Sequence, residues 1–174
     1  MNPQSVRVKS NPGAAPGLEH DEIVQLGGTP GSVKLTCVDY CPGEALFQEI
    51  HDLDDFLARH RPEWSRVRWI SMEGLSDRNA IQALAKKYEL HPLAIEDVLH
   101  VTERPKVEPY GGEDSEMLAR LFIVTQAAVL EGRLLRTEQI SIFLGHKTVL
   151  TFRERAGDLW EPIRQRIQSK NSRL

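Results

Sequence analysis

The sequence predicts an α/β (or α+β) fold in which a mixed β-sheet is sandwiched by helices, giving three layers in the order α/β/α. Strand-like segments precede and follow residues 76–99, and within that stretch apolar residues recur with the 3.6-residue period of a helix. Because a sheet and amphipathic helices bury their apolar faces against one another, this arrangement favours a layered sandwich.

The composition suits one folded domain. The chain has 174 residues, of which 40% are hydrophobic and 27% charged, so it is long and apolar enough to bury a core. A net charge of -3 argues against a nucleic-acid partner bound through overall positive charge. With two cysteines, no signal peptide and no apolar run of about 18 residues, we expect a soluble protein of a reducing compartment.

Three regions are predicted along the chain. Residues 1–32 are rich in proline and glycine and poor in large apolar residues, which predicts a flexible N-terminal tail. Residues 33–157 carry the strand and helix patterns of the α/β/α domain. Residues 158–174 have helical character and are treated as a separate C-terminal segment.

The N-terminal half of the domain combines strands and helices. We expect strands over 33–37, 46–50 and 67–72, from their alternating or compact apolar composition, and a short helix that begins near Asp52. A second helix follows Ser76, a good N-cap, with Asp77 at the positive end of the helix dipole. A third begins at His91-Pro92, because proline is tolerated at the first helical position, and ends before Pro105.

The C-terminal half is predicted to be mostly sheet. Strands are expected over 118–130, 139–144 and 148–152, with a hairpin turn at Glu131-Gly132 and a tight turn at Gly145-His146. A final helix is expected near Asp158, with Pro162 in its first turn. No C-cap precedes Leu174, so either the sequence ends inside a longer helix or this helix frays naturally.

Most familiar chemical motifs are missing. Cys37 and Cys41 would lie about 13 Å apart along a strand, too far for a disulfide, and no second ligand pair completes a zinc knuckle. The acidic residues 52, 54 and 55 lack the glycine and glutamate of a calcium loop. Without a nucleophile elbow, a P-loop or a dinucleotide fingerprint, and without the clustered ligands of a metal-dependent hydrolase, we expect the protein not to be an enzyme.

One helix carries a candidate metal site. On the helix that begins at Pro92, the side chains of Glu96, Asp97 and His100 fall within a sector of about 100°. Two adjacent carboxylates repel each other unless they are solvated or close to a cation, and their oxygens suit a hard divalent ion such as Mg²⁺. The alternative is an ordinary charged helix face, and the periodicity leaves both interpretations open.

The exact residues of this segment point to a protein family more specifically than their periodicity does. Residues 91–108, HPLAIEDVLHVTERPKVE, resemble the signature of the soluble domain of the CorA family of Mg²⁺/Co²⁺ channels. The resemblance continues through 138–144, 147–154 and 157–164, and includes Trp69-Ile70 and Gly74-Leu75. It covers about residues 33–168, with the segments in the order of the family.

The resemblance implies a fold, a partner and a cofactor. CorA proteins are homopentamers whose cytoplasmic α/β/α domains lead into a long stalk helix and two transmembrane helices with a Gly-Met-Asn pore motif. Regulatory Mg²⁺, or Co²⁺ or another divalent cation, binds between neighbouring domains and favours the closed state. The resemblance thus implies a domain at the cytoplasmic face of the plasma membrane, with no small organic substrate, and makes residues 158–174 the start of the stalk helix region.

The family pattern transfers to few residues of this chain. Asp97 and Glu96 match the acidic pair of its E-D-[IV]-L motif, in which the aspartate faces a carboxylate on a neighbouring stalk; Asp97 is the first candidate ligand, Glu96 the second and His100 the third. The segment 104–108 is interpreted as structural, a turn entering a strand. This sequence has no stalk beyond Leu174, no transmembrane helices and no Gly-Met-Asn, so we expect a soluble fragment that does not conduct ions by itself. A ZntB-like zinc transporter domain and a stand-alone soluble metal-binding module are the alternatives.

Overall fold

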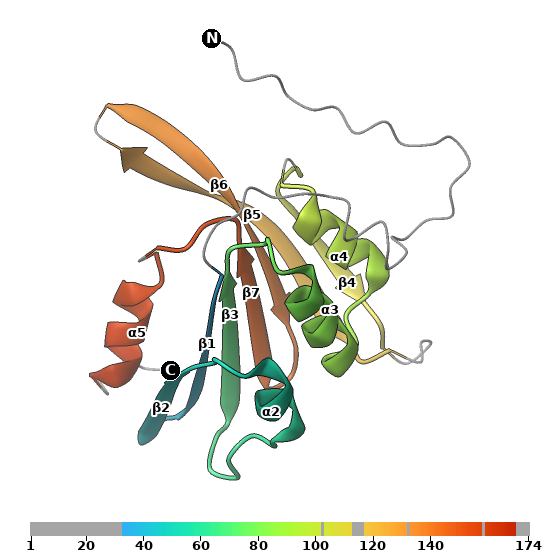
Figure 1. The fold of residues 1–174 in the computed structure, drawn as a ribbon, viewed down its shortest axis with the longest axis vertical. Helices are drawn as coiled ribbons and strands as arrows, with labels where there is room; N and C mark the ends of the chain where they lie inside the picture. Colours follow the sequence, from blue (N-terminus) through green and yellow to red (C-terminus); the bar gives the residue numbers. More distant parts are fainter. Residues whose placement is uncertain (1–32, 102, 113–116, 132, 158, 170–174) are drawn as a thin grey trace.

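The strands form one seven-stranded sheet. The computed structural model describes residues 33–101, 103–112, 117–131, 133–157 and 159–169, and the strand order is β2-β1-β3-β7-β6-β5-β4 (Figure 1). Only β3 and β7 pair in parallel among the described strands, so the sheet is mixed, as predicted. The bounds are β1 Lys34–Cys41, β2 Glu44–Glu49, β3 Val67–Glu73, β4 Lys106–Tyr110, β5 Arg120–Glu131, β6 Leu134–Leu144 and β7 Thr148–Arg153.

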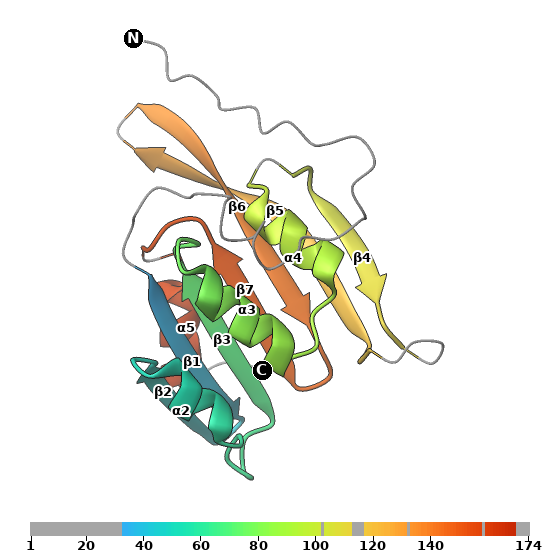
Figure 2. The ribbon, with the colours of Figure 1, turned by 45° about the vertical axis from the view of Figure 1, so that its right-hand side comes forward.

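Helices cover both faces of this sheet. Figure 2 shows α2 (Leu53–Ala58), α3 (Arg78–Lys87) and α4 (Pro92–Leu99) in front of the strands, with α5 (Glu161–Gln168) behind them. The predicted α/β/α order is therefore confirmed. Among the described residues, α2, α3 and α4 thus lie on one face of the sheet and α5 on the other, and α4 lies beside β4 at one edge of the molecule (Figure 2).

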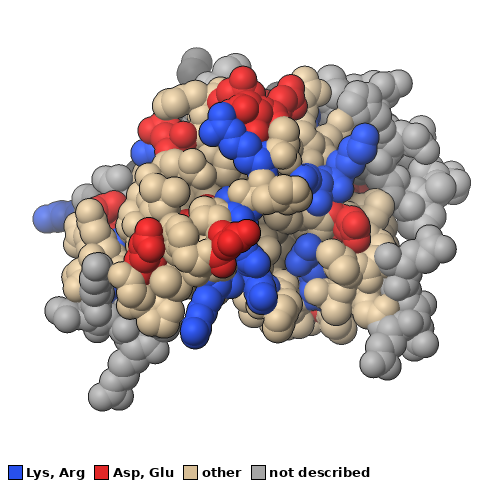
Figure 3. Space-filling model, turned by 90° about the horizontal axis from the view of Figure 1, so that it is seen from below, with Lys and Arg blue, Asp and Glu red and all other residues tan. Residues whose placement is uncertain are grey.

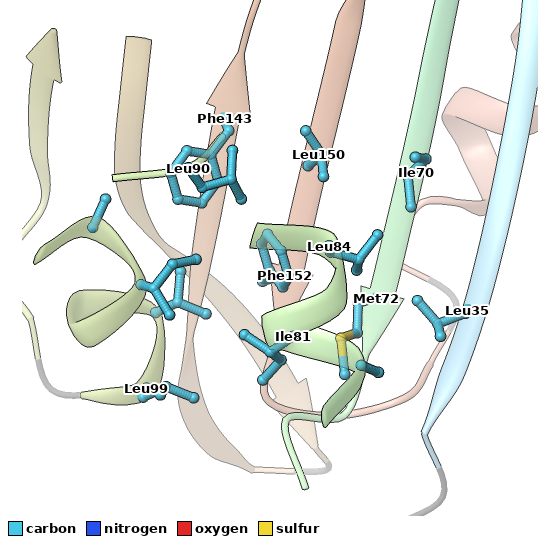
Figure 4. Close-up of a cluster of buried hydrophobic side chains, with 14 of the residues drawn as sticks. Leu35, Ile70, Met72, Ile81, Leu84, Leu90, Leu99, Phe143, Leu150 and Phe152 are labelled. Atoms are coloured by element: carbon cyan, nitrogen blue, oxygen red, sulfur yellow. The ribbon is translucent and has the colours of Figure 1, made fainter. Parts of the chain in front are cut away.

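The main core lies between the sheet and the three helices. Figure 4 shows side chains of α3 and α4, among them Ile81, Leu84 and Leu99, directed toward the strands. Across from them the strands contribute Leu35, Ile70, Met72, Phe143, Leu150 and Phe152. A smaller cluster on the opposite face packs Ile167 of α5 against Val38 and Trp69. Burial of these apolar side chains is the main force that holds the layers together.

Two helix starts differ from the prediction. Asp77, not Ser76, caps α3, because its Oδ1 accepts a hydrogen bond of 2.9 Å from the backbone N–H of Ala80. The final helix begins at Glu161, later than the expected start near Asp158, which lies outside the described residues. The backbone N–H groups of Arg155 and Gly157 donate to carboxylates of the sheet, so this stretch is tied down before the helix begins.

A buried ion-pair network holds that stretch and α5 against the sheet. Arg153 lies 2.8 Å from Glu138 and 3.9 Å from Glu73, and Arg164 of α5 lies 3.1 Å from Glu73. The two glutamates and Arg153 are buried, and the network joins β3, β6, β7 and α5. Each buried charge therefore has an opposite charge and hydrogen bonds to compensate its desolvation.

A second buried pair lies beneath α2. The Arg68 guanidinium donates to both carboxylate oxygens of Asp39, at 2.9 and 2.8 Å, and its Cζ lies 5.1 Å from the ring centroid of Phe56. Cys37 is buried beside Asp39, and burial raises the pKa of its thiol to about 12. Both Cys37 and Cys41 are free, which confirms the absence of a disulfide between them.

Several predictions fall on residues that the structure does not describe. They are the flexible tail 1–32, the turn residue Gly132 and the helical continuation over 170–174, and the three regional boundaries stay predictions.

Within the described part of the chain, no helix has the length and apolar character required to cross a membrane. Acidic and basic side chains are interspersed on the face shown in Figure 3.

Candidate metal site between α4 and β4

The start of α4 is fixed by two adjacent residues. His91 is the N-cap, and its Nδ1 accepts a 3.2 Å hydrogen bond from the backbone N–H of Leu93. Pro92 occupies the first turn, where its missing N–H costs no helical hydrogen bond. The predicted helix start is therefore confirmed, and the imidazole of His91 satisfies one of the free N–H groups at this end.

Burial of one face of α4 sets the direction of the acidic residues. Ala94, Ile95, Val98 and Leu99 are all buried against the sheet. Glu96 and Asp97 lie between these positions and are half-buried at the margin of the helix. His100 follows as the C-cap, and its backbone N–H donates to the carbonyl of Glu96. The structure thus places all three candidate residues on one short segment, at the boundary between core and solvent.

A buried glutamine fixes the end of this helix. Gln139 of β6 is only 2% exposed, and its Nε2 donates a 2.9 Å hydrogen bond to the backbone carbonyl of Asp97. Its Oε1 accepts a 3.0 Å hydrogen bond from the backbone N–H of Glu103. The first of these contacts satisfies the carbonyl of Asp97, which lies among the last carbonyls of the helix, and such carbonyls have no partner within the helix. Gln139 therefore clamps the backbone that carries Asp97.

The Asp97 carboxylate is paired with a lysine of the neighbouring strand. Lys106 Nζ lies 2.8 Å from Asp97 Oδ2 and 3.2 Å from Glu108 Oε2. Tyr110 donates a 2.9 Å hydrogen bond from its hydroxyl to Glu108, and its ring stacks on His91 with 4.5 Å between the centroids. Alternate residues of β4 thus form a continuous row of contacts from one end of α4 to the other.

Hydrogen bonds along this row shift the pKa values of Lys106 and Glu108 toward the charged forms of both groups. α4 has no basic residue in its last turn, so the cation that offsets the negative end of the helix dipole beside Asp97 comes from Lys106 of β4. Desolvation lowers the pKa of Lys106, but hydrogen bonds to Asp97 and Glu108 outweigh it and raise that pKa above its usual value. The hydrogen bond from Tyr110, together with Lys106, lowers the pKa of Glu108 despite some desolvation.

The donors fit a hard divalent cation in type but form no closed site in one chain. Asp97 and Glu96 offer carboxylate oxygens, and Mg²⁺ is commonly held by one or two carboxylates with water as its other ligands. Among the described residues, no group of three or more His, Cys, Asp or Glu side chains could hold a metal. The structure brings Asp97 together with Lys106, and does not gather Glu96, Asp97 and His100 into such a group.

The sequence interpretation missed two residues of this site. The segment 104–108 does enter a strand, as predicted, but Lys106 also contacts Asp97. Gln139 is the first residue of the strand expected over 139–144, and that prediction did not indicate that its side chain is buried. The sequence signal for the burial of Gln139 is weak. Residues 139, 141 and 143 share one side of β6 at the two-residue period of a strand face, and Ser141 and Phe143 are buried with Gln139.

Comparison with known proteins assigns this chain to a protein family. The model of a family described as "CorA-like Mg2+ transporter protein" matches residues 64–174, which include α4, β4 and Gln139. The chain belongs to this family, which is one of cation transporters and not a class of enzymes. The "Cobalt/magnesium transport protein CorA" of Thermotoga maritima is 29% identical over 157 residues, 89% of this chain and 42% of that protein.

Two solved structures share the fold. The full-length CmaX protein superposes with a TM-score of 0.62 at 12% identity, over 83% of this chain and 42% of that chain. The ZntB cytoplasmic domain of Vibrio parahaemolyticus superposes with a TM-score of 0.57 at 13% identity, over 80% of this chain and 51% of that one. The chain therefore spans about half of these relatives or less.

Proposed function

We propose that this chain is the cytoplasmic metal-sensing domain of a CorA-type magnesium and cobalt channel or transporter. Family membership over residues 64–174 supports this assignment. The observation that carries it is that Asp97, a half-buried carboxylate with access to solvent at the margin of α4, lies within the matched segment and has its backbone clamped in place. A ligand that must respond to a cation needs such a defined position and access to solvent.

In this proposal Asp97 and Glu96 are the ligands that the chain contributes, with His100 as a third candidate. The complete protein is a homopentamer in the membrane, and a regulatory divalent cation lies between neighbouring domains at its cytoplasmic face. The bound cation supplies the positive charge that offsets repulsion between two acidic surfaces. Because it favours the state in which those surfaces are close, it favours the closed state.

The test is Mg²⁺-dependent protection from limited proteolysis, measured on the complete gene product. We expect MgCl₂ to protect the parent protein, and Asp97→Ala to raise the Mg²⁺ concentration required by about tenfold, within the usual range of coupling between sites. The matched control is Asp54→Ala, which removes an exposed carboxylate from α2 and should leave protection unchanged. Equal protection of the parent and Asp97→Ala would remove Asp97 from the sensor.

The same assay with ZnCl₂, together with fractionation of the cell, separates the two alternatives. Protection by ZnCl₂ at concentrations where MgCl₂ has no effect would support a ZntB-like zinc transporter instead. Recovery of the complete gene product outside the membrane fraction would support a stand-alone metal-binding module and contradict the transporter assignment.

A further inference from the structure

The position of Lys106 has a consequence for cation binding at Asp97. Its ammonium lies between two carboxylates, 2.8 Å from Asp97 Oδ2 and 3.2 Å from Glu108 Oε2. A divalent cation coordinated by Asp97 needs oxygen lone pairs of the same carboxylate at about 2.0–2.1 Å for Mg²⁺. The ammonium therefore occupies one of the two oxygens of the Asp97 carboxylate, and its charge repels a cation that approaches either oxygen.

The structure also provides a place for the ammonium when it leaves Asp97. Glu108 is held by the hydroxyl of Tyr110, whose ring stacks on His91, so its carboxylate is positioned independently of Asp97. Lys106 has a flexible four-carbon stem and is 28% exposed, against 17% for Asp97. The lysine can thus release Asp97 while it keeps Glu108 as partner, and neither charge is left buried and unpaired.

We propose that Lys106 is a built-in competitor for the Asp97 carboxylate, which a divalent cation must displace onto Glu108 before it binds. This inference rests on the proposed role of Asp97 as a cation ligand. Lys106 thereby lowers the affinity of the site and sets the cation concentration at which Asp97 changes partner. Monovalent cations carry no more charge than the ammonium they would replace, so the exchange favours divalent ions.

The test is an MgCl₂ titration of the 174-residue chain at constant ionic strength, followed by the NMR shifts of the backbone amides of α4. We expect Lys106→Met, which keeps most of the stem and removes the charge, to lower the half-saturating Mg²⁺ concentration at least about fivefold. Lys106→Gln serves as a second neutral variant, and Lys106→Arg keeps the charge and should titrate close to the parent. The control for net charge is Lys147→Met, an exposed lysine at the β6–β7 turn, which should also match the parent.

Each outcome bears on the inference. If the α4 amides of the parent respond to Mg²⁺, but neither neutral Lys106 variant binds more tightly, competition is wrong and the cation site stands. Equal tightening in Lys147→Met would also overturn it, since the effect would then be one of net charge. If no amide of α4 responds even in the folded neutral variants, the competition fails, and the protection assay on the complete gene product decides separately whether Asp97 is a ligand. Asp97→Asn, introduced into Lys106→Met, should abolish the response.

Discussion

Two ion pairs of this domain have the same length and opposite surroundings. Asp39–Arg68 and Asp97–Lys106 both close at 2.8 Å. The first pair is 1% and 8% exposed, makes two parallel hydrogen bonds and lies under α2. The second is 17% and 28% exposed, makes a single contact, and shares its lysine with Glu108.

The difference separates a structural pair from an exchangeable one. A buried carboxylate that loses its only cationic partner cannot be rescued by water, so the Asp39–Arg68 pair must stay closed as long as the domain is folded. A pair in contact with solvent, such as Asp97–Lys106, contributes little to stability, and its members can change partners at low cost. Burial, more than distance, thus decides which of the two aspartates is available to a cation.

The largest expected effect is on stability when each aspartate is neutralised. Asp39→Asn leaves Arg68 charged and buried, so we expect a loss of about 3–5 kcal/mol in the free energy of unfolding, measured with urea. Asp97→Asn leaves Lys106 paired with Glu108, and the loss should stay below about 1 kcal/mol. Similar losses for both variants would contradict the distinction.

A smaller effect is expected from the clamp that places Asp97. Gln139→Leu leaves the carbonyl of Asp97 and the N–H of Glu103 without their side-chain partner, so we expect a loss of about 1–3 kcal/mol in urea unfolding. The matched control is Gln165→Leu, whose exposed hydrogen bond to Glu161 should contribute almost nothing. Unchanged stability and unchanged α4 amide shifts in Gln139→Leu would show that the helix end does not depend on this clamp.

The smallest expected effect is on stability at alkaline pH. It concerns Tyr110, which donates a hydrogen bond to Glu108 next to the Asp97–Lys106 pair. Desolvation, and then the hydrogen bond to Glu108, raise the pKa of Tyr110 from 10.0 to about 12. Because the pKa of Tyr110 is higher in the folded state than in the unfolded state, its contribution to the free energy of unfolding is complete below about pH 10. That contribution is lost as the pH rises through about 12. Tyr110→Phe should therefore lose less stability than the parent as the pH rises from about 10 to about 12 in urea titrations. Identical pH dependence in both proteins would contradict the raised pKa.

The fold was largely predictable because its signals are local. The start of α4 follows from Pro92 and from the apolar residues that recur after it at helical spacing. The strands follow from the alternation of apolar and polar residues and from β-branched composition. The cap of α3 was assigned one residue too early, since Ser76 and Asp77 are both good caps, and the choice depends on which side chain reaches the N–H of Ala80. Such a choice depends on the path of the preceding backbone.

The site was only partly predictable, because its contacts join different elements. Asp97 was identified as a candidate, and its role as a ligand stays a prediction. Its pairing with Lys106 requires that β4 run alongside α4, and the clamp by Gln139 requires that β6 lie beneath the helix end. Neither arrangement can be inferred from periodicity, because it follows from the order of strands in the sheet.

The parallel contact between β3 and β7 has a kinetic consequence. It places Arg68 opposite Thr148, and the chain between them includes α3, α4 and three strands of the sheet. The strands on either side of this contact pair with neighbours along the chain, as β1 does with β2 and β5 with β6. The β3–β7 contact instead closes a long loop, so it forms only after the loop-closure entropy has been overcome. From this topology we expect the pairing of β3 with β7 to be a late, non-local step in the assembly of the sheet, at which the two halves of the domain meet.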